Sequence, residues 1–217
     1  MNTQNPSTIH YYNTCDSLAS WQLAKQMTLF LEEFFTDSRQ LILLCIGTDR
    51  VTGDSLGPLV GHHLKKRRLK NVEIYGTLKE PVHALNLKET VSHIKTVSPD
   101  IPILAIDASL GCKEHLGFVT IQKGAINPGA GVHKSLDAVG DLSITGIVNL
   151  SGSFEQTILQ TTRLSTVVTM AECIATAIFL AWTQHLKQYT PIYNTIKIPS
   201  ASAYGDALAS QYPNNNG

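Results

Sequence analysis

Two short, continuously apolar runs limit most strongly what this chain can fold into. LILLCIG spans residues 41–47 and IPILAIDA spans residues 101–108, and neither run alternates between apolar and polar side chains. A strand with that pattern is buried on both faces, which is typical of a parallel sheet covered by helices. Segments with apolar residues at helical spacing stand before, between and after the two runs. The sequence therefore predicts an α/β protein.

The order of the remaining elements supports this fold class. We expect helices over residues 16–35, 56–69, 83–97 and 163–185, and strands over residues 41–47, 72–77, 101–108, 118–121 and 142–150. Strands that alternate with helices form a parallel sheet with helices on both faces, joined by right-handed crossovers. A strand order that begins 2-1-3 would set the first and third strands side by side. Asp16 stands where the N-cap of the first helix is expected.

The chain is long enough for one large domain with a sizeable core. It has 217 residues, 43% of them hydrophobic, and contains no internal repeat or low-complexity linker. We expect a single domain over residues 1–217, with a helical extension at 1–40, a core at 41–190 and a frayed tail at 191–217.

The balance of charge limits the partners. Lys plus Arg and Asp plus Glu each total 17, so nothing indicates nucleic-acid binding, which usually requires a basic domain. Charged residues make up 16% of the chain, below the roughly 25% of an average domain. Much of the surface is therefore uncharged, and we expect part of it to be covered by another subunit of a homo-oligomer.

Cysteine usage and hydropathy bear on location. The four cysteines are scattered without a CxxC pair, which fits a reducing, cytoplasmic compartment. The N-terminus lacks the basic-then-apolar pattern of a signal peptide. Residues 164–182 form the most apolar stretch but contain Glu172, so we predict a buried helix rather than a membrane span, and no membrane partner.

The stretch CIGTDRVTGDSLGP, at residues 45–58, is unusual for a connection between a strand and a helix. It holds Asp49, Asp54, three glycines and a proline, whereas a plain connection needs about two to six residues. Asp107 is expected at the very end of the third strand. Ligands in such sheets bind beyond the strand ends where the order reverses, and neighbouring strands lie about 4.8 Å apart. We therefore expect the carboxylates of Asp54 and Asp107 to share one pocket.

Two carboxylates in one pocket would support either of two chemistries. Their negative charges would repel each other if both were ionised, so the pKa of one carboxyl group rises. The pair can then activate water as an acid and a base. The same pair could hold a divalent metal, and His133 in the glycine-rich segment 127–140 would complete a set of oxygen and nitrogen ligands. His133 could instead shuttle a proton.

Other interpretations of these residues stay open. Asp54 could cap the following helix, although Ser55 could do so alone, and Asp49 is better explained by an Asx-turn. Cys112 could be a nucleophile, but no pattern typical of a catalytic cysteine surrounds it. Ser151 does not belong to a GxSxG motif. The loop matches neither GxGxxG nor GxxxxGKS, and its aspartates would repel a phosphate.

Three motifs together resemble a known group of proteins. They are CIGTDRVTGDSLGPLVG, AIDASLG and NPGAGVHKSLDAVGDLSITGIVNLSG, all within residues 41–186. They resemble the YyaC-type sporulation proteins, which are relatives of the germination protease of spore-forming bacteria and, more distantly, of the hydrogenase maturation endopeptidases. The resemblance implies a three-layer α/β/α sandwich with a mostly parallel sheet, of the phosphorylase/hydrolase-like type.

The resemblance also implies roles for individual residues. Asp54 and Asp107 match the aspartates associated with peptidase activity in the germination protease, and they match two nickel-binding positions of the maturation endopeptidases, with His133 as the third. The implied function is a sporulation-associated peptidase that cleaves protein or peptide substrates, such as spore proteins, in the spore or forespore interior. A bound metal would then be nickel or zinc. The alternative is a non-catalytic sporulation or germination factor that keeps the protease fold and binds a partner or a metal.

Overall fold

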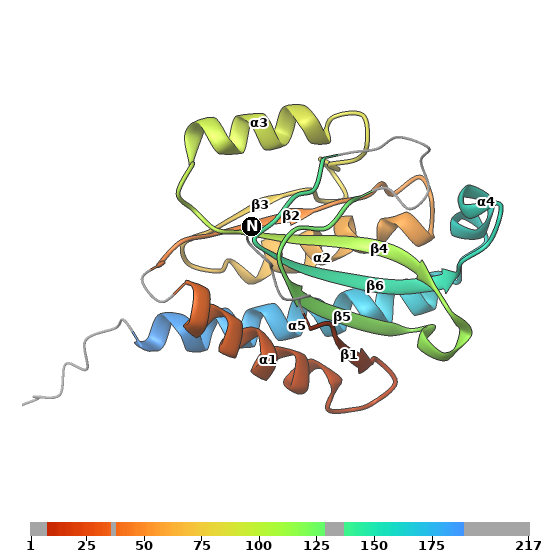
Figure 1. The fold of residues 1–217 in the computed structure, drawn as a ribbon, viewed down its shortest axis with the longest axis horizontal. Helices are drawn as coiled ribbons and strands as arrows, with labels where there is room; N and C mark the ends of the chain where they lie inside the picture. The colour runs from red at the N-terminus through yellow and green to blue at the C-terminus, as the bar shows by residue number, and fades with distance from the viewer. Residues whose placement is uncertain (1–7, 36–37, 129–136, 189–217) are drawn as a thin grey trace, which may run out of the picture. The chain divides into compact units, whose positions relative to one another are not determined.

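The computed structural model describes residues 8–35, 38–128 and 137–188. A six-stranded sheet forms its centre, in the order β1-β5-β6-β4-β2-β3 (Figure 1). The strands are β1 His10–Asn13, β2 Leu41–Cys45, β3 Val72–Tyr75, β4 Ile103–Gly111, β5 Phe118–Lys123 and β6 Leu142–Leu150. Strands β3, β2, β4 and β6 are parallel neighbours, whereas β5 runs antiparallel to both β6 and β1.

Helices cover both faces of this sheet. They are α1 Ala19–Phe34, α2 Leu56–Arg67, α3 Leu87–Val97, α4 Glu155–Gln160 and α5 Leu164–Gln188. Figure 1 shows α3 on one face and α1, α2 and α5 on the other. The alternating side chains of β2 divide accordingly: Leu41 and Leu43 join the core with α1, α2 and α5, while Ile42 and Leu44 join the core with α3. The predicted three-layer α/β/α sandwich with a mostly parallel sheet is confirmed.

The expected strand order is also confirmed at its centre. The run at 41–47 lies between the run at 72–77 and the run at 101–108, so the first and third predicted strands are neighbours. The short edge strand β1 was not predicted. Helix α1 is an integral part of the fold, because Leu23, Met27 and Leu31 belong to the same core as the sheet.

Two local predictions were wrong. Asp16 does not cap α1: its Oδ1 accepts a hydrogen bond of 2.9 Å from the backbone N–H of Leu18, and the helix begins only at Ala19. Helix α3 begins at Leu87 rather than at residue 83. The preceding residues are held in a turn instead, in which the N–H of His83 donates to the side chain of Asn86 at 2.8 Å.

Helix α5 lies against the sheet as a core helix. Within the described residues it is the one helix long and apolar enough to cross a membrane, and 50% of its most apolar stretch is buried inside the protein. Its buried face includes Met170, Ile174, Ile178 and Trp182. This packing agrees with the prediction of a buried helix.

Candidate functional site

Asp107 lies on β4 at the point where β2 and β4, the two central parallel strands, stop pairing. The parallel ladder between β2 and β4 ends at the pair Cys45 and Ile106, where the N–H of Ile46 donates to the carbonyl of Ile106 at 2.7 Å. Asp107 is therefore the first residue of β4 beyond that ladder. Its side chain is 5% exposed, and its Oδ1 accepts a hydrogen bond of 2.8 Å from the N–H of Ala108.

The prediction that Asp107 ends its strand was wrong. Strand β4 continues to Gly111, because β6 is equally long and keeps pairing with it after β2 has left the sheet. Leu104, Ile106 and Ala108 face the core with α1, α2 and α5. Since side chains alternate along a strand, Asp107 points toward the other face, the one that carries α3.

The carboxyl ends of β2 and β4 form the topological switch point of the sheet. The connection after β2 runs through α2 on one face, whereas the connection into β4 runs through α3 on the other (Figure 1). The two connections therefore diverge at the carboxyl ends of β2 and β4. Ligands bind at this position in open α/β sheets.

The loop after β2 folds back on itself at this switch point. The N–H of Thr48 donates to the backbone carbonyl of Asp54 at 3.0 Å, and the N–H of Gly47 donates to the carbonyl of Val82 at 2.8 Å. Gly47 has a φ of +134°, and a Cβ there would lie 2.0 Å from that same Asp54 carbonyl oxygen. Only glycine allows this closure, which sets the short 3-10 helix η1, Gly53–Ser55, against β4 and α4.

Asp54 lies on η1, and its carboxyl group is largely removed from water. Burial raises its pKa to about 6, an effect that a backbone hydrogen bond from Thr48 partly offsets. Ser55 is the N-cap residue of α2 but makes no capping bond, since its hydroxyl donates to the carbonyl of Thr52 at 2.6 Å. Asp49 is exposed, and the turn beside it is made by the hydroxyl of Thr48, which accepts from the N–H of Arg50 at 3.3 Å. Of the two loop aspartates, Asp54 is thus the one whose carboxyl group is largely buried, and that burial raises its pKa.

A row of hydroxyl groups continues from Asp107 across the sheet. Thr145 of β6 pairs with Asp107 in register, and Thr120 of β5 pairs with Thr145. The two threonine hydroxyls lie 2.7 Å apart. Ser143, two residues before Thr145, is 1% exposed, and its hydroxyl has no hydrogen-bond partner within the described residues. Ser143 and Thr145, two polar residues at alternate positions in the apolar first half of β6, are the sequence signal for this row, which was not predicted.

The predicted metal set is only partly represented. His133 lies outside the described residues, and within them no group of three His, Cys, Asp or Glu side chains could hold a metal ion. Two carboxylates supply oxygen donors, whereas nickel and zinc sites usually include imidazole or thiolate ligands. Asp54 and Asp107 alone are therefore an incomplete set for either metal.

Cys112 has an unpredicted partner, His115. Its Sγ lies 3.4 Å from Nδ1 of His115, across the short turn that follows β4. The imidazole is held in place by stacking on Tyr11, with ring centroids 4.5 Å apart, and by an edge contact with Phe118. The pair is exposed at the thiol and lies five residues beyond Asp107 along the chain.

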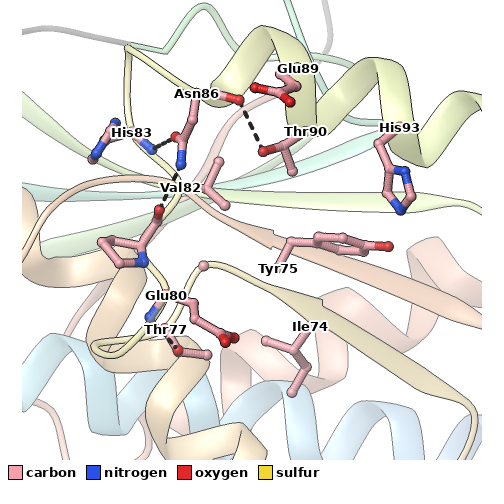
Figure 2. A pocket seen from close by; sticks show the side chains of 12 residues that line it. Ile74, Tyr75, Thr77, Glu80, Val82, His83, Asn86, Glu89, Thr90 and His93 are labelled. Atoms are coloured by element: carbon pink, nitrogen blue, oxygen red, sulfur yellow. Dashed lines mark hydrogen bonds between the residues drawn. The ribbon is translucent and has the colours of Figure 1, made fainter.

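An open cavity of about 720 Å³ lies between the end of β3 and α3 (Figure 2). Tyr75, Glu80, His83 and His93 are among the residues that line it. It contains neither aspartate, but Val82 lines it as well, and the Val82 carbonyl accepts the bond from Gly47 at the start of the loop. The start of the loop thus adjoins a hollow with a mixed polar and apolar lining, whose volume lies in the usual range of ligand pockets.

Comparisons with known proteins place the chain in a family. Residues 11–177 match the family described as "Protein of unknown function (DUF1256)". The chain is 42% identical over 170 residues to "Uncharacterized protein YyaC" of Bacillus subtilis (strain 168), covering 78% of this chain and 82% of that protein. It is also similar to the [NiFe] hydrogenase maturation protease HycI from Thermococcus kodakarensis KOD1, at 19% identity and a TM-score of 0.41, over 69% of this chain and 99% of that one. The match over most of its length shows that this chain belongs to the DUF1256 family.

Proposed function

We propose that this protein is a peptidase in which Asp54 and Asp107 activate a water molecule for attack on a peptide bond. The observation that carries the proposal is the placement of Asp54 on η1, which packs against β4, the strand that carries Asp107. The burial that results raises the pKa of Asp54 to about 6. A group with such a pKa can take up and release a proton near neutral pH, as a general base must. Carboxyl groups whose pKa is perturbed by burial are found often at functional sites.

The two aspartates have different roles in the proposed reaction. Ionised Asp54 removes a proton from water as the water oxygen attacks the peptide carbonyl carbon, and it later gives that proton to the leaving amine. Asp107 accepts a hydrogen bond from the other O–H of the water and so orients it, and that hydrogen stays on the attacking oxygen. The hydroxyls of Thr145 and Thr120, on the next two strands, extend this polar surface toward the substrate. The products are a carboxylic acid and an amine, and no step requires a metal.

The first substrates to test come from the resemblance to the germination protease, namely small acid-soluble spore proteins. An enzyme with such substrates would act in the cytoplasm of the spore or forespore. The purified full chain is incubated with these proteins, and the fragments are identified by mass spectrometry with and without added nickel or zinc. Cleavage at defined positions supports the proposal. A lack of cleavage at every pH from about 5 to about 8 would favour the non-catalytic role instead.

The pH dependence of cleavage tests the role given to Asp54. Because Asp54 must be ionised to accept a proton and its pKa is about 6, we expect kcat/KM to rise as the pH increases through about 6 and then to level off. The measurement is an initial-rate profile with a fixed peptide substrate. A rate that falls through the same range would mean that Asp54 acts first as an acid.

The stability of Asp54→Asn provides a test that needs no substrate. Since burial raises the pKa of Asp54 from its usual value of about 4 to about 6, the folded state binds a proton more readily than the unfolded state, and stability falls as the pH rises through this range. Above it, the ionised carboxylate costs on the order of 2 kcal/mol, after allowance for its partial exposure. Asp54→Asn should therefore unfold at higher urea concentration than the wild type at pH 8, with no such gain at pH 4. Destabilisation at pH 8 would show that the carboxylate has a structural role.

A further inference from the structure

An apolar groove separates α1 from α5 on the face of the sheet opposite α3. Its volume is about 760 Å³, and three large apolar side chains stand exposed along it: Trp21 at 58%, Leu29 at 50% and Leu180 at 41%. Charged residues at its rim are Lys25, Glu32 and Lys187. A cluster of exposed large apolar side chains with a polar rim is typical of a surface that another protein covers.

We propose that a second copy of this chain covers the groove, which makes the protein a two-fold symmetric dimer. In such a dimer the same patch meets itself, so its charges must complement one another after a half-turn. Trp21, Lys25, Leu29 and Glu32 share one face of α1, because their spacing follows the helical repeat. With the two-fold axis beside Leu29, the α1 helices of the two copies are antiparallel, and Lys25 faces the partner's Glu32.

The charge pattern favours a second copy over a different protein. Lys25 and Glu32 stand on either side of Leu29 with opposite charges, so this face of α1 complements a second copy of itself after a half-turn. The Nζ of Lys25 also lies 5.7 Å from the centroid of the Trp21 ring. The chain also has only 16% charged residues, which is consistent with a surface partly covered by another subunit. Asp107 points toward the face that carries α3, opposite α1 and α5 (Figure 1). A dimer joined through α1 and α5 therefore leaves that face and the cavity beside α3 open to substrate.

The mass of the full chain in solution tests the dimer. Size-exclusion chromatography with light scattering should give twice the 23.7 kDa of one chain at about 50 µM, within the micromolar range that interfaces of ordinary size can reach. Leu29→Glu should give a monomer, because it buries like charges at the axis. Leu85→Glu is the matched control: Leu85 is 82% exposed but lies outside the groove, so its variant should remain a dimer. Circular dichroism confirms that both variants are folded.

Charge exchange tests the proposed geometry. Lys25→Glu and Glu32→Lys should each weaken dimerisation at least tenfold, since each sets like charges opposite one another, and the double variant should restore it. A monomeric wild type, whatever else covers the groove, would overturn the proposal. So would a dimer that Leu29→Glu does not dissociate, or single charge variants that the double variant does not rescue.

Discussion

Replacing either Asp54 or Asp107 by Asn is expected to lower kcat/KM for peptide cleavage by about three orders of magnitude, the range of a general base and its partner. Asn has nearly the same shape as Asp but cannot take a proton from water. The fold should survive both changes. At position 107 an amide oxygen can still accept the hydrogen bond of 2.8 Å from the N–H of Ala108, and at position 54 the change removes a buried charge.

The double variant and a matched control make this prediction specific. If both aspartates act on one water molecule, Asp54→Asn combined with Asp107→Asn should be no less active than either single variant, since residues that act as a unit do not contribute additively. Asp49→Asn changes an exposed carboxylate in the same loop and should keep full activity. Full activity in either single variant at position 54 or 107 would contradict the proposed mechanism.

The sequence allowed the fold to be predicted well because its strongest signal is local. An apolar run such as residues 41–47, flanked by segments with helical spacing, is typical of a parallel strand buried between two layers of helices. Strand β1 was missed because it has only four residues, with two exposed, and is defined by pairing with β5 more than a hundred residues later. A segment of four residues is too short to show the alternating pattern that would predict such a distant partner.

The candidate site could be predicted only in part, for the same reason. The loop with Asp54 and the acid at position 107 stand out in the sequence, but the length of β4 depends on how far β6 accompanies it. The row from Asp107 to Thr145 and Thr120 exists only once three strands are in register. The burial that raises the pKa of Asp54 likewise results from η1 packing on β4 and α4, which are distant in sequence.

The glycines of the CIGTDRVTGDSLGPLVG stretch have separate physical roles. Gly47 is needed for the loop to close at positive φ, whereas Gly57 and Gly61 stand one turn apart within α2 at ordinary helical positions. A Cβ on Gly57 would lie 2.1 Å from the carbonyl oxygen of Ile46, and one on Gly61 would lie 2.0 Å from the carbonyl oxygen of Gly76. Neither glycine can be explained by a turn. Both let the backbone of α2 approach the ends of β2 and β3.

Gly57→Ala and Gly61→Ala are therefore expected to destabilise the protein by about 3 kcal/mol each, although alanine normally stabilises a helix. The clash is with backbone oxygens, which cannot rotate away, so α2 must move off the sheet. Urea unfolding measures the loss. The control is Gly124→Ala, where φ is +92° but nothing lies within 4 Å, so only backbone strain of about 1 kcal/mol is expected. Because η1 leads directly into α2, the two α2 variants should also displace Asp54 and lower peptide cleavage, whereas Gly124→Ala should not. Equal losses of stability in all three variants would show that close packing of α2 is not what these glycines provide.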